Sequence, residues 1–167
     1  MLVAAEKHKR MYRRLSELGE SRGSVSKTLN EFILEGGKTR KINLTACIKE
    51  PRKYSRFDHA IEVMEWMQKR KMNFSHFDHA VFLDLTAKTK GIAAAENYFD
   101  NLPPSVQNHV TYSTLLNCYC MELMSEKSLT LFEKMDKMKL LSTSMSSSNL
   151  MTACLLIIFP ICVCVTL

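Results

Sequence analysis

Glycine and proline are scarce in this chain, which has only five Gly and four Pro among its 167 residues. Sheet-rich folds place such residues at their many turns, so this scarcity, together with abundant Met, Leu, Lys and Glu, favours helices joined by short connections. The six cysteines show no C-x-x-C spacing and no framework typical of a small secreted scaffold. They indicate reduced thiols in an intracellular or organellar protein.

Signatures of catalysis are also missing from the sequence. We find no Gly-rich phosphate loop, no Ser/His/Asp arrangement and no paired carboxylates at a spacing that suits acid and base chemistry. His76 and His79 fall three residues apart at a helix start, but no carboxylate or cysteine with metal-ligand spacing accompanies them. We therefore expect a protein that is not an enzyme and that holds no cofactor and no metal.

Charge is unevenly distributed along the chain. Residues 1–72 contain 17 Lys and Arg against 9 Asp and Glu, whereas residues 73–167 contain 6 against 8. A basic half beside a nearly neutral half suggests contact with a polyanion through one end of the molecule. The alternative is a solvated helix face with no partner.

A pattern of small and apolar residues recurs three times in the middle of the chain. Each copy has a small residue followed by apolar residues three, four and seven positions later, which is one stripe of an α-helix. Copies 33 to 35 residues apart are typical of stacked helical hairpins, because one hairpin cannot bury its apolar face alone. The copies begin at Ala60, Ala95 and Ser128, and these three small residues are expected at close helix contacts.

Three helical hairpins and a leading helix follow from the pattern. A leading helix capped by Ser24 or Ser26 is predicted to end at Gly36 and Gly37. Pro51 is expected to kink or end the first helix of the first hairpin near Glu50. The predicted helices of the hairpins are 42–53 with 58–69, 77–88 with 92–101, and 111–121 with 125–138, and a fourth hairpin is expected to begin near Ser147.

These residues resemble a known family. Residues 110–120 (VTYSTLLNCYC) and 128–135 (SLTLFEKM) resemble the 35-residue motif of plant pentatricopeptide repeat proteins. Residues 48–54, 57–60, 65–67, 83–85 and 91–96 are similar to the N-terminal part of a P-class subgroup usually found in plant mitochondria, and the resemblance spans residues 11–152. It implies an all-α protein, an α-solenoid of about three stacked antiparallel hairpins plus an N-terminal helix, in the mitochondrion or alternatively the chloroplast.

The resemblance divides the chain into four parts. Residues 1–22 form a basic N-terminal segment, residues 23–41 a leading or capping helix, and residues 42–144 the repeats. Residues 145–167 are an incomplete repeat that runs into an apolar tail with no charged residue after Lys139. Three readings of the tail stay open: a truncated or misjoined gene product, a membrane anchor, or a segment that caps the last hairpin.

The resemblance also implies a function and the residues that perform it. Family members bind single-stranded RNA, with about one base per repeat read by two or three side chains. The reading pairs carry over as Ser113 with Thr143 and as Asp78 with Asn108, and Val110 would clamp a base. The sequence-independent attraction is assigned to a basic ridge at i, i+3, i+4 and i+7, formed by Lys49, Arg52, Lys53 and Arg56.

The expected function is therefore that of an organellar RNA-binding protein acting in RNA processing, stability or translation. So few repeats would hold RNA only weakly, because stacking contributes roughly 1–3 kcal/mol per base and ordering costs are subtracted. A protein-interaction scaffold that does not bind RNA is the alternative, since the same solenoid could bind other proteins. A membrane-tethered domain would rest on the tail alone, and we do not expect a membrane as partner.

Overall fold

A computed structural model describes residues 11, 13–15, 24–37, 39–53 and 56–140, except for the side chains of residues 50, 51 and 53. This part of the chain contains seven complete helices and no strand. The chain divides into two compact units, residues 1–73 and 74–167. The helices are α2 (Val25–Leu34), α3 (Lys41–Lys53), α4 (Phe57–Lys69), α5 (His76–Lys90), α6 (Ile92–Asp100), α7 (His109–Met121) and α8 (Ser125–Lys137).

In the first unit, the leading helix α2 packs on α4, which also pairs with α3. The Ser24 hydroxyl caps α2 by accepting a hydrogen bond from the amide of Lys27, and Gly36 follows the helix with a φ of +78°. The Glu62 carboxylate of α4 accepts hydrogen bonds from the Ser24 hydroxyl at 2.6 Å and from the Ser26 amide at 3.1 Å. A carboxylate from α4 thus holds the start of α2, and the predicted leading helix is confirmed.

Pro51 does not end α3 where we expected. The helix continues to Lys53, three residues beyond the predicted end near Glu50. A proline in the last turn removes only its own amide donor, and few turns remain downstream for it to disturb. The expected end near Glu50 is therefore wrong, because Pro51 lies close to the end of the helix, while the predicted bounds 42–53 agree with α3 to within one residue.

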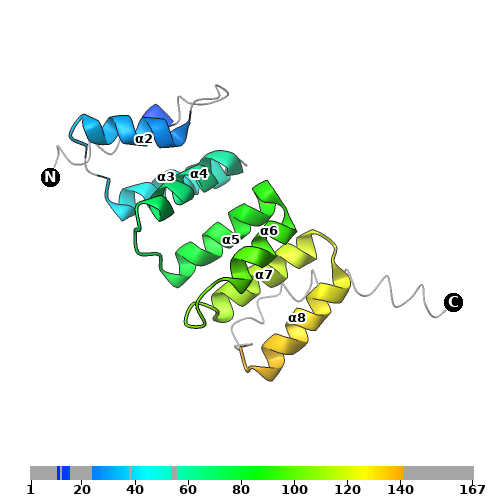
Figure 1. The fold of residues 1–167 in the computed structure, drawn as a ribbon. Helices are drawn as coiled ribbons and strands as arrows, with labels where there is room; N and C mark the ends of the chain where they lie inside the picture. Colours follow the sequence, from blue (N-terminus) through cyan, green and yellow to red (C-terminus); the bar gives the residue numbers. More distant parts are fainter. Residues whose placement is uncertain (1–10, 12, 16–23, 38, 54–55, 141–167) are drawn as a thin grey trace. The chain divides into compact units, whose positions relative to one another are not determined.

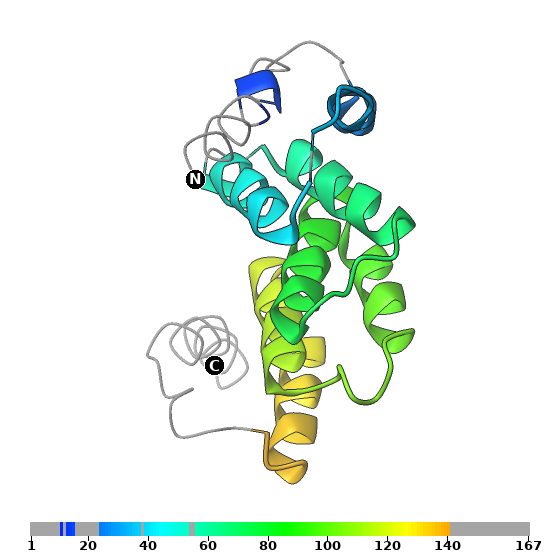
Figure 2. The ribbon, with the colours of Figure 1, turned by 90° about the vertical axis from the view of Figure 1, so that its left-hand side faces the viewer.

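In the second unit, α5 and α6 form one antiparallel hairpin and α7 packs against both (Figures 1 and 2). Gly91 joins α5 to α6 with a φ of +87°, a conformation that side-chain-bearing residues rarely adopt. Near the start of α5, His79 stacks with Tyr98, which lies near the end of α6. Near the end of α6, Phe99 makes an edge contact with Tyr112 at the start of α7. Both α5 and α7 are therefore antiparallel to α6, so they run parallel to each other and begin at the same end (Figure 1).

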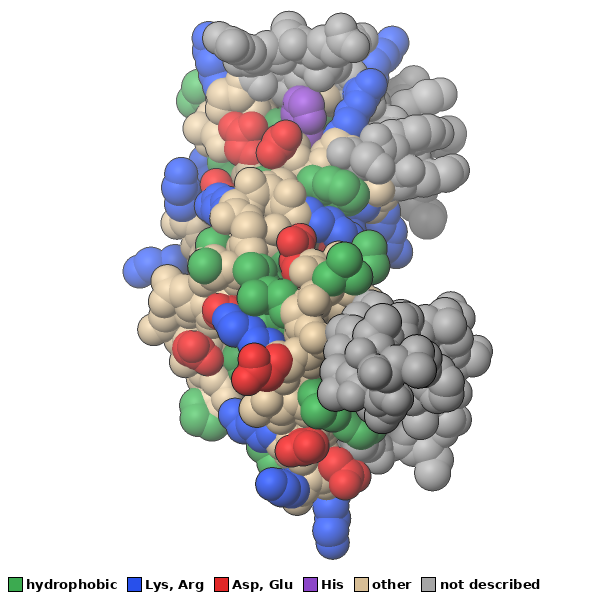
Figure 3. Space-filling view, turned by 90° about the vertical axis from the view of Figure 1, so that its right-hand side faces the viewer, with side chains coloured by type: hydrophobic (Ala, Val, Ile, Leu, Met, Phe, Trp, Pro, Cys, Tyr) green, Lys and Arg blue, Asp and Glu red, His purple; other side chains and the backbone are tan. Residues whose placement is uncertain are grey.

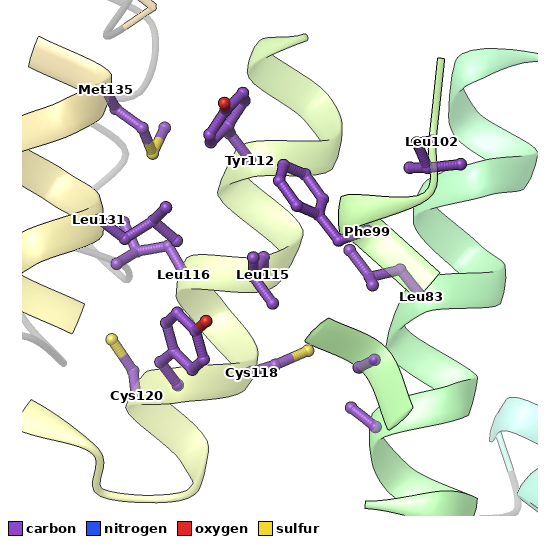
Figure 4. Close-up of a cluster of buried hydrophobic side chains, with 13 residues drawn as sticks. Leu83, Phe99, Leu102, Tyr112, Leu115, Leu116, Cys118, Cys120, Leu131 and Met135 are labelled. Atoms are coloured by element: carbon purple, nitrogen blue, oxygen red, sulfur yellow. The ribbon is translucent and has the colours of Figure 1, made fainter. Parts of the chain in front are cut away.

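The core of this second unit is a cluster of buried side chains from all four helices (Figure 4). Phe99 lies between Leu83 of α5 and Tyr112 of α7, and Met135 of α8 reaches toward Tyr112. Ala95 and Ser128 are almost fully buried, at 0% and 4% exposure, as the small positions of the repeat predict. Ala60, the equivalent residue of the first unit, is also fully buried.

The all-α fold of helical hairpins is confirmed, and the six hairpin helices begin and end within two residues of their predicted bounds. Stacking is observed directly where the α7 and α8 hairpin packs on α5 and α6. The fourth hairpin near Ser147, the apolar tail and the basic segment up to residue 10 lie outside the described residues. None of the helices in the described ranges is long and apolar enough to cross a membrane.

Candidate nucleic-acid interface

Two of the predicted RNA-reading residues, Asp78 and Asn108, take part in the capping boxes at the starts of α5 and α7. Asp78 accepts hydrogen bonds from the amide and the hydroxyl of Ser75, both at 2.6 Å, while its own amide donates to the Ser75 hydroxyl at 3.3 Å. Asn108 caps α7 by accepting from the amides of Val110 at 3.0 Å and Thr111 at 3.4 Å. Both side chains therefore bind the helix start in this structure.

The two capping boxes define which residues of α5 and α7 are equivalent. Ser75 and Asn108 are the N-cap residues, so each position of α5 corresponds to the position of α7 that lies 33 residues later. The same spacing separates Ala95 of α6 from Ser128 of α8. Burial agrees, because both members are buried in the pairs Phe82 and Leu115, Leu83 and Leu116, Leu85 and Cys118, Thr86 and Tyr119, and Ala87 and Cys120.

This register changes the residue that corresponds to Ser113 in the second hairpin. Ser113 is the fifth residue of α7, whereas Asp78 is only the third residue of α5 and corresponds to Thr111. The fifth residue of α5 is Ala80, which is 7% exposed and has no polar side-chain atom. Asp78 is predicted as a reader because it follows an aromatic residue, Phe77, as Ser113 follows Tyr112, which is a spacing of 35 residues. The 33-residue spacing of Ala95 and Ser128 was the signal in the sequence that pointed to Ala80.

In the third hairpin, Val110 and Ser113 lie in the first two turns of α7 and are half-buried. The Ser113 hydroxyl donates to the carbonyl of His109, one turn earlier, and Thr114 donates in the same way to the carbonyl of Val110 at 2.9 Å. Such bonds hold a hydroxyl against its own helix. Thr143, the predicted partner of Ser113, lies outside the described residues.

The basic residues of the first unit do not form a ridge on one helix. Lys49 and Arg52 lie on α3, and Lys49 is exposed while Arg52 is half-buried. Arg56 is exposed but precedes α4 as its N-cap residue, because α3 has already ended at Lys53. The side chain of Lys53 lies outside the described part. The i to i+7 ridge is therefore wrong, and the cations are instead distributed over the end of α3 and the connection to α4.

Acidic and basic side chains are intermixed on the face drawn in Figure 3. Exposed cations of the first unit that could attract a polyanion include Lys49 and Arg56.

The histidines and cysteines make no metal centre in the described residues, where no group of three or more metal-binding side chains occurs. His79 hydrogen-bonds through Nδ1 to the Tyr98 hydroxyl at 2.8 Å. Cys47, Cys118 and Cys120 are buried thiols, and burial raises the pKa of the Cys47 and Cys118 thiols to about 11. These two thiols are therefore protonated at neutral pH and suit packing better than nucleophilic chemistry.

A family model described as PPR repeat matches residues 110–140, which are α7, α8 and the residues just after them. Two mitochondrial pentatricopeptide repeat-containing proteins of Arabidopsis thaliana are 48% and 41% identical to this chain over 90% and 88% of its length. A large ribosomal subunit protein of the same plant, mL101, is 38% identical over 81% of the chain. The chain spans 28 to 30% of the length of these relatives. It belongs to the pentatricopeptide repeat family, whose members are generally organellar RNA-binding proteins.

Proposed function

We propose that this chain is an RNA-binding helical-repeat segment of a mitochondrial protein that acts in RNA processing, stability or translation. The observation that carries the proposal is the repeat match on residues 110–140, in which Val110 and Ser113 occupy the first two turns of the first helix. The mitochondrial names of two relatives support the location. Single-stranded RNA is the ligand because repeats of this kind read unpaired bases, about one per repeat.

The arrangement of α5 and α7 favours a strand that crosses the repeats one after another. The two helices are parallel and packed together, so their first turns lie at one end of the unit (Figure 1). A strand that passes this end would meet Phe77 in one repeat, then Val110 and Ser113 in the next. Asn108 lies at the start of α7, between these two sets in the sequence.

Affinity should be low and depend strongly on salt. Stacking contributes roughly 1–3 kcal/mol per base, and the cost of ordering the strand offsets part of it. Exposed cations such as Lys49 and Arg56 add attraction to phosphates that is independent of sequence. Releasing counterions from the RNA makes this part of the affinity fall as salt rises.

The experiment is a fluorescence anisotropy titration of labelled single-stranded RNA at several salt concentrations. Replacing Lys49, Arg52 and Arg56 by Ala should weaken binding to every RNA sequence and flatten the salt slope by up to about 0.7 for each phosphate that is no longer neutralised. The matched control removes three exposed lysines from α2, α4 and α8, namely Lys27, Lys69 and Lys137. The control should keep most of the slope, and an equally flattened slope in the two variants would overturn the assignment.

A protein-interaction scaffold is the second candidate, and two observations favour it. The polar atoms of Asp78, Asn108 and Ser113 are hydrogen-bonded within the chain, which leaves fewer of them to read a base. In addition, one relative is named as a protein of the large ribosomal subunit. Under this function the wild-type chain would show no binding to single-stranded RNA even at low salt, so the same titration separates the two candidates.

A further inference from the structure

The connection between α7 and α8 carries two strongly exposed apolar side chains, Met121 at 71% and Leu123 at 70%. Met121 is the last residue of α7, and Leu123 follows two residues later, before α8 begins at Ser125. Apolar side chains exposed singly are common on protein surfaces, whereas neighbouring ones mark a binding surface when the fold does not need them. Both the preceding hairpin and the other helix ends show that the fold does not need these two.

The equivalent connection between α5 and α6 carries lysines in their place. Because α5 and α7 begin 33 residues apart, and so do α6 and α8, Met121 and Leu123 correspond to Lys88 and Lys90. Both lysines are exposed, and the Lys88 side chain stays 38% exposed although α7 packs against α5. The hairpin therefore does not require apolar residues here, and a further hairpin packed on α7 in the same way would leave these positions exposed.

The backbone at Leu123 does not require a leucine either. Its φ of +57° is in the left-handed region, which glycine adopts with less strain than other residues. Its amide and the next one donate to carbonyls in the last turn of α7, which is a common way for a helix to end. The ends of α4 and α8 have the same bonds and conformation, and there the residue is an exposed lysine, Lys71 or Lys139.

Two carboxylates accompany the apolar pair. Glu122 lies between the two apolar residues in the sequence and Glu126 lies in the first turn of α8, and both are exposed. Neither carboxylate forms an ion pair with another described residue, and Lys127 beside them is paired with Glu96 of α6 at 2.5 Å. This negative charge would repel the phosphates of RNA and of anionic lipids, and it would attract a cationic partner. A protein segment with apolar and cationic side chains therefore fits this connection best.

We propose that the connection between α7 and α8 is a protein-docking surface for a basic amphipathic helix. Met121 and Leu123 contact the apolar face of that helix, and Glu122 and Glu126 pair with its lysines or arginines. A helix suits the surface because its apolar residues recur every three or four positions, with cationic residues beside them. This function goes beyond RNA binding and is independent of it, since the connection lies at the opposite end of α7 from the first turns. Two apolar anchors are few, so the association should be weak and transient.

The probe is a fluorescein-labelled peptide about 18 residues long, with leucines on one helical face and lysines on the other. It is titrated with the full chain, and binding is followed by fluorescence anisotropy. Replacing Met121 by Ala together with Leu123 by Gly leaves the charge unchanged and should lower the affinity about tenfold or more. The matched control replaces Leu34 and Ile42, which are 86% and 75% exposed in the first unit, by Ala and should bind as the wild type does.

Charge and folding are tested separately. Glu122→Gln combined with Glu126→Gln should weaken binding at low salt and remove most of its salt dependence. Leu123→Gly alone should keep or raise the thermal unfolding midpoint, because glycine tolerates the left-handed conformation, and yet bind the peptide more weakly.

Three results would overturn the docking surface. The first is a wild type that does not bind the peptide, or that binds equally well when glutamates replace its lysines. The second is a variant of Met121 and Leu123 that binds as tightly as the wild type. The third is a variant that keeps peptide binding but loses binding to phosphatidylglycerol vesicles or to oligouridylate, which would assign the surface to a membrane or to RNA.

Discussion

The second and third hairpins have the same arrangement of helices and buried residues, but they carry different side chains at several equivalent positions. At equivalent positions of their first helices, α5 carries Phe77, Ala80 and Asp84, and α7 carries Val110, Ser113 and Asn117. Asp84 is buried and pairs with Lys88 at 2.8 Å, four residues later on the same helix. Asn117 has no charge, and Met121 stands where Lys88 stands. The buried apolar residues are thus repeated at equivalent positions, whereas the residues at these three positions differ in size, polarity and charge.

The largest loss of stability is expected when a buried leucine that both hairpins share is replaced by alanine. Leu83 and Leu116 are equivalent, and their side chains are 0% and 1% exposed. Leu83→Ala and Leu116→Ala should each lower the free energy of unfolding by about 2–5 kcal/mol, because each leaves a cavity in the cluster of Figure 4. Urea denaturation followed by circular dichroism measures both, with the half-exposed Leu129→Ala as control. A small loss of stability at one leucine and a large loss at the other would show that the two positions are not equivalent.

The small buried residues Ala95 and Ser128 provide the next test of whether the two hairpins pack in the same way. Ala95→Leu and Ser128→Leu add a large side chain where the helices are close, and overpacking should cost about 1–3 kcal/mol in each hairpin. The thermal unfolding midpoint of both variants should fall relative to the wild type. Unchanged stability in either variant would mean that the small residue is not a close-packing position.

Loss of the caps should have a smaller effect, similar in the two hairpins. Ser75→Ala and Asn108→Ala each remove a side chain that accepts hydrogen bonds at a helix start, which should cost about 0.5–2 kcal/mol. Ser75→Gly and Asn108→Gly should cost only a few tenths of a kcal/mol. Chemical denaturation of the four variants decides whether capping is the role of these side chains. If Asn108→Ala left stability unchanged but weakened RNA binding, Asn108 would act as a reader and not as a cap.

The smallest expected effect is a pH dependence of stability that arises from an ion pair between the two hairpins, Glu96 of α6 with Lys127 of α8. Hydrogen bonding to Lys127, at 2.5 Å, lowers the pKa of Glu96, and a weaker bond from Tyr119 acts in the same direction against burial. A depressed folded-state pKa gives stability that is present above the unfolded value of about 4.3 and lost as pH falls through the folded value. Because the pair is partly exposed, the contribution should stay below about 1 kcal/mol. Glu96→Gln should flatten the stability profile in that acidic range, and an unchanged profile would show that the pair contributes nothing.

Much of the fold could be predicted from the sequence because residues that pack in the core recur at regular spacings along the chain. The stripes at Ala60, Ala95 and Ser128 predicted six helices, and the structure has all six within two residues. The alternative end of α3 near Glu50 was wrong, because a proline in the last turn of a helix is tolerated.

The site was harder to predict than the fold. Phe77-Asp78 looks like Tyr112-Ser113, but local likeness does not determine register. The caps at Ser75 and Asn108 do, and they move the comparison by two residues to Ala80. Which polar atoms are already bonded, as in Asp78 and Asn108, is a property of three-dimensional geometry that residue types alone do not reveal.

The most direct test of the RNA-binding account is ultraviolet crosslinking of the full chain to short single-stranded RNA, followed by mass spectrometry of the crosslinked peptides. We expect crosslinks in the first turns of α5 and α7, around Phe77 and around residues 109–113. An excess of unlabelled single-stranded RNA should compete for these crosslinks. Crosslinks confined to α6 and α8, or none at low salt, would contradict the account.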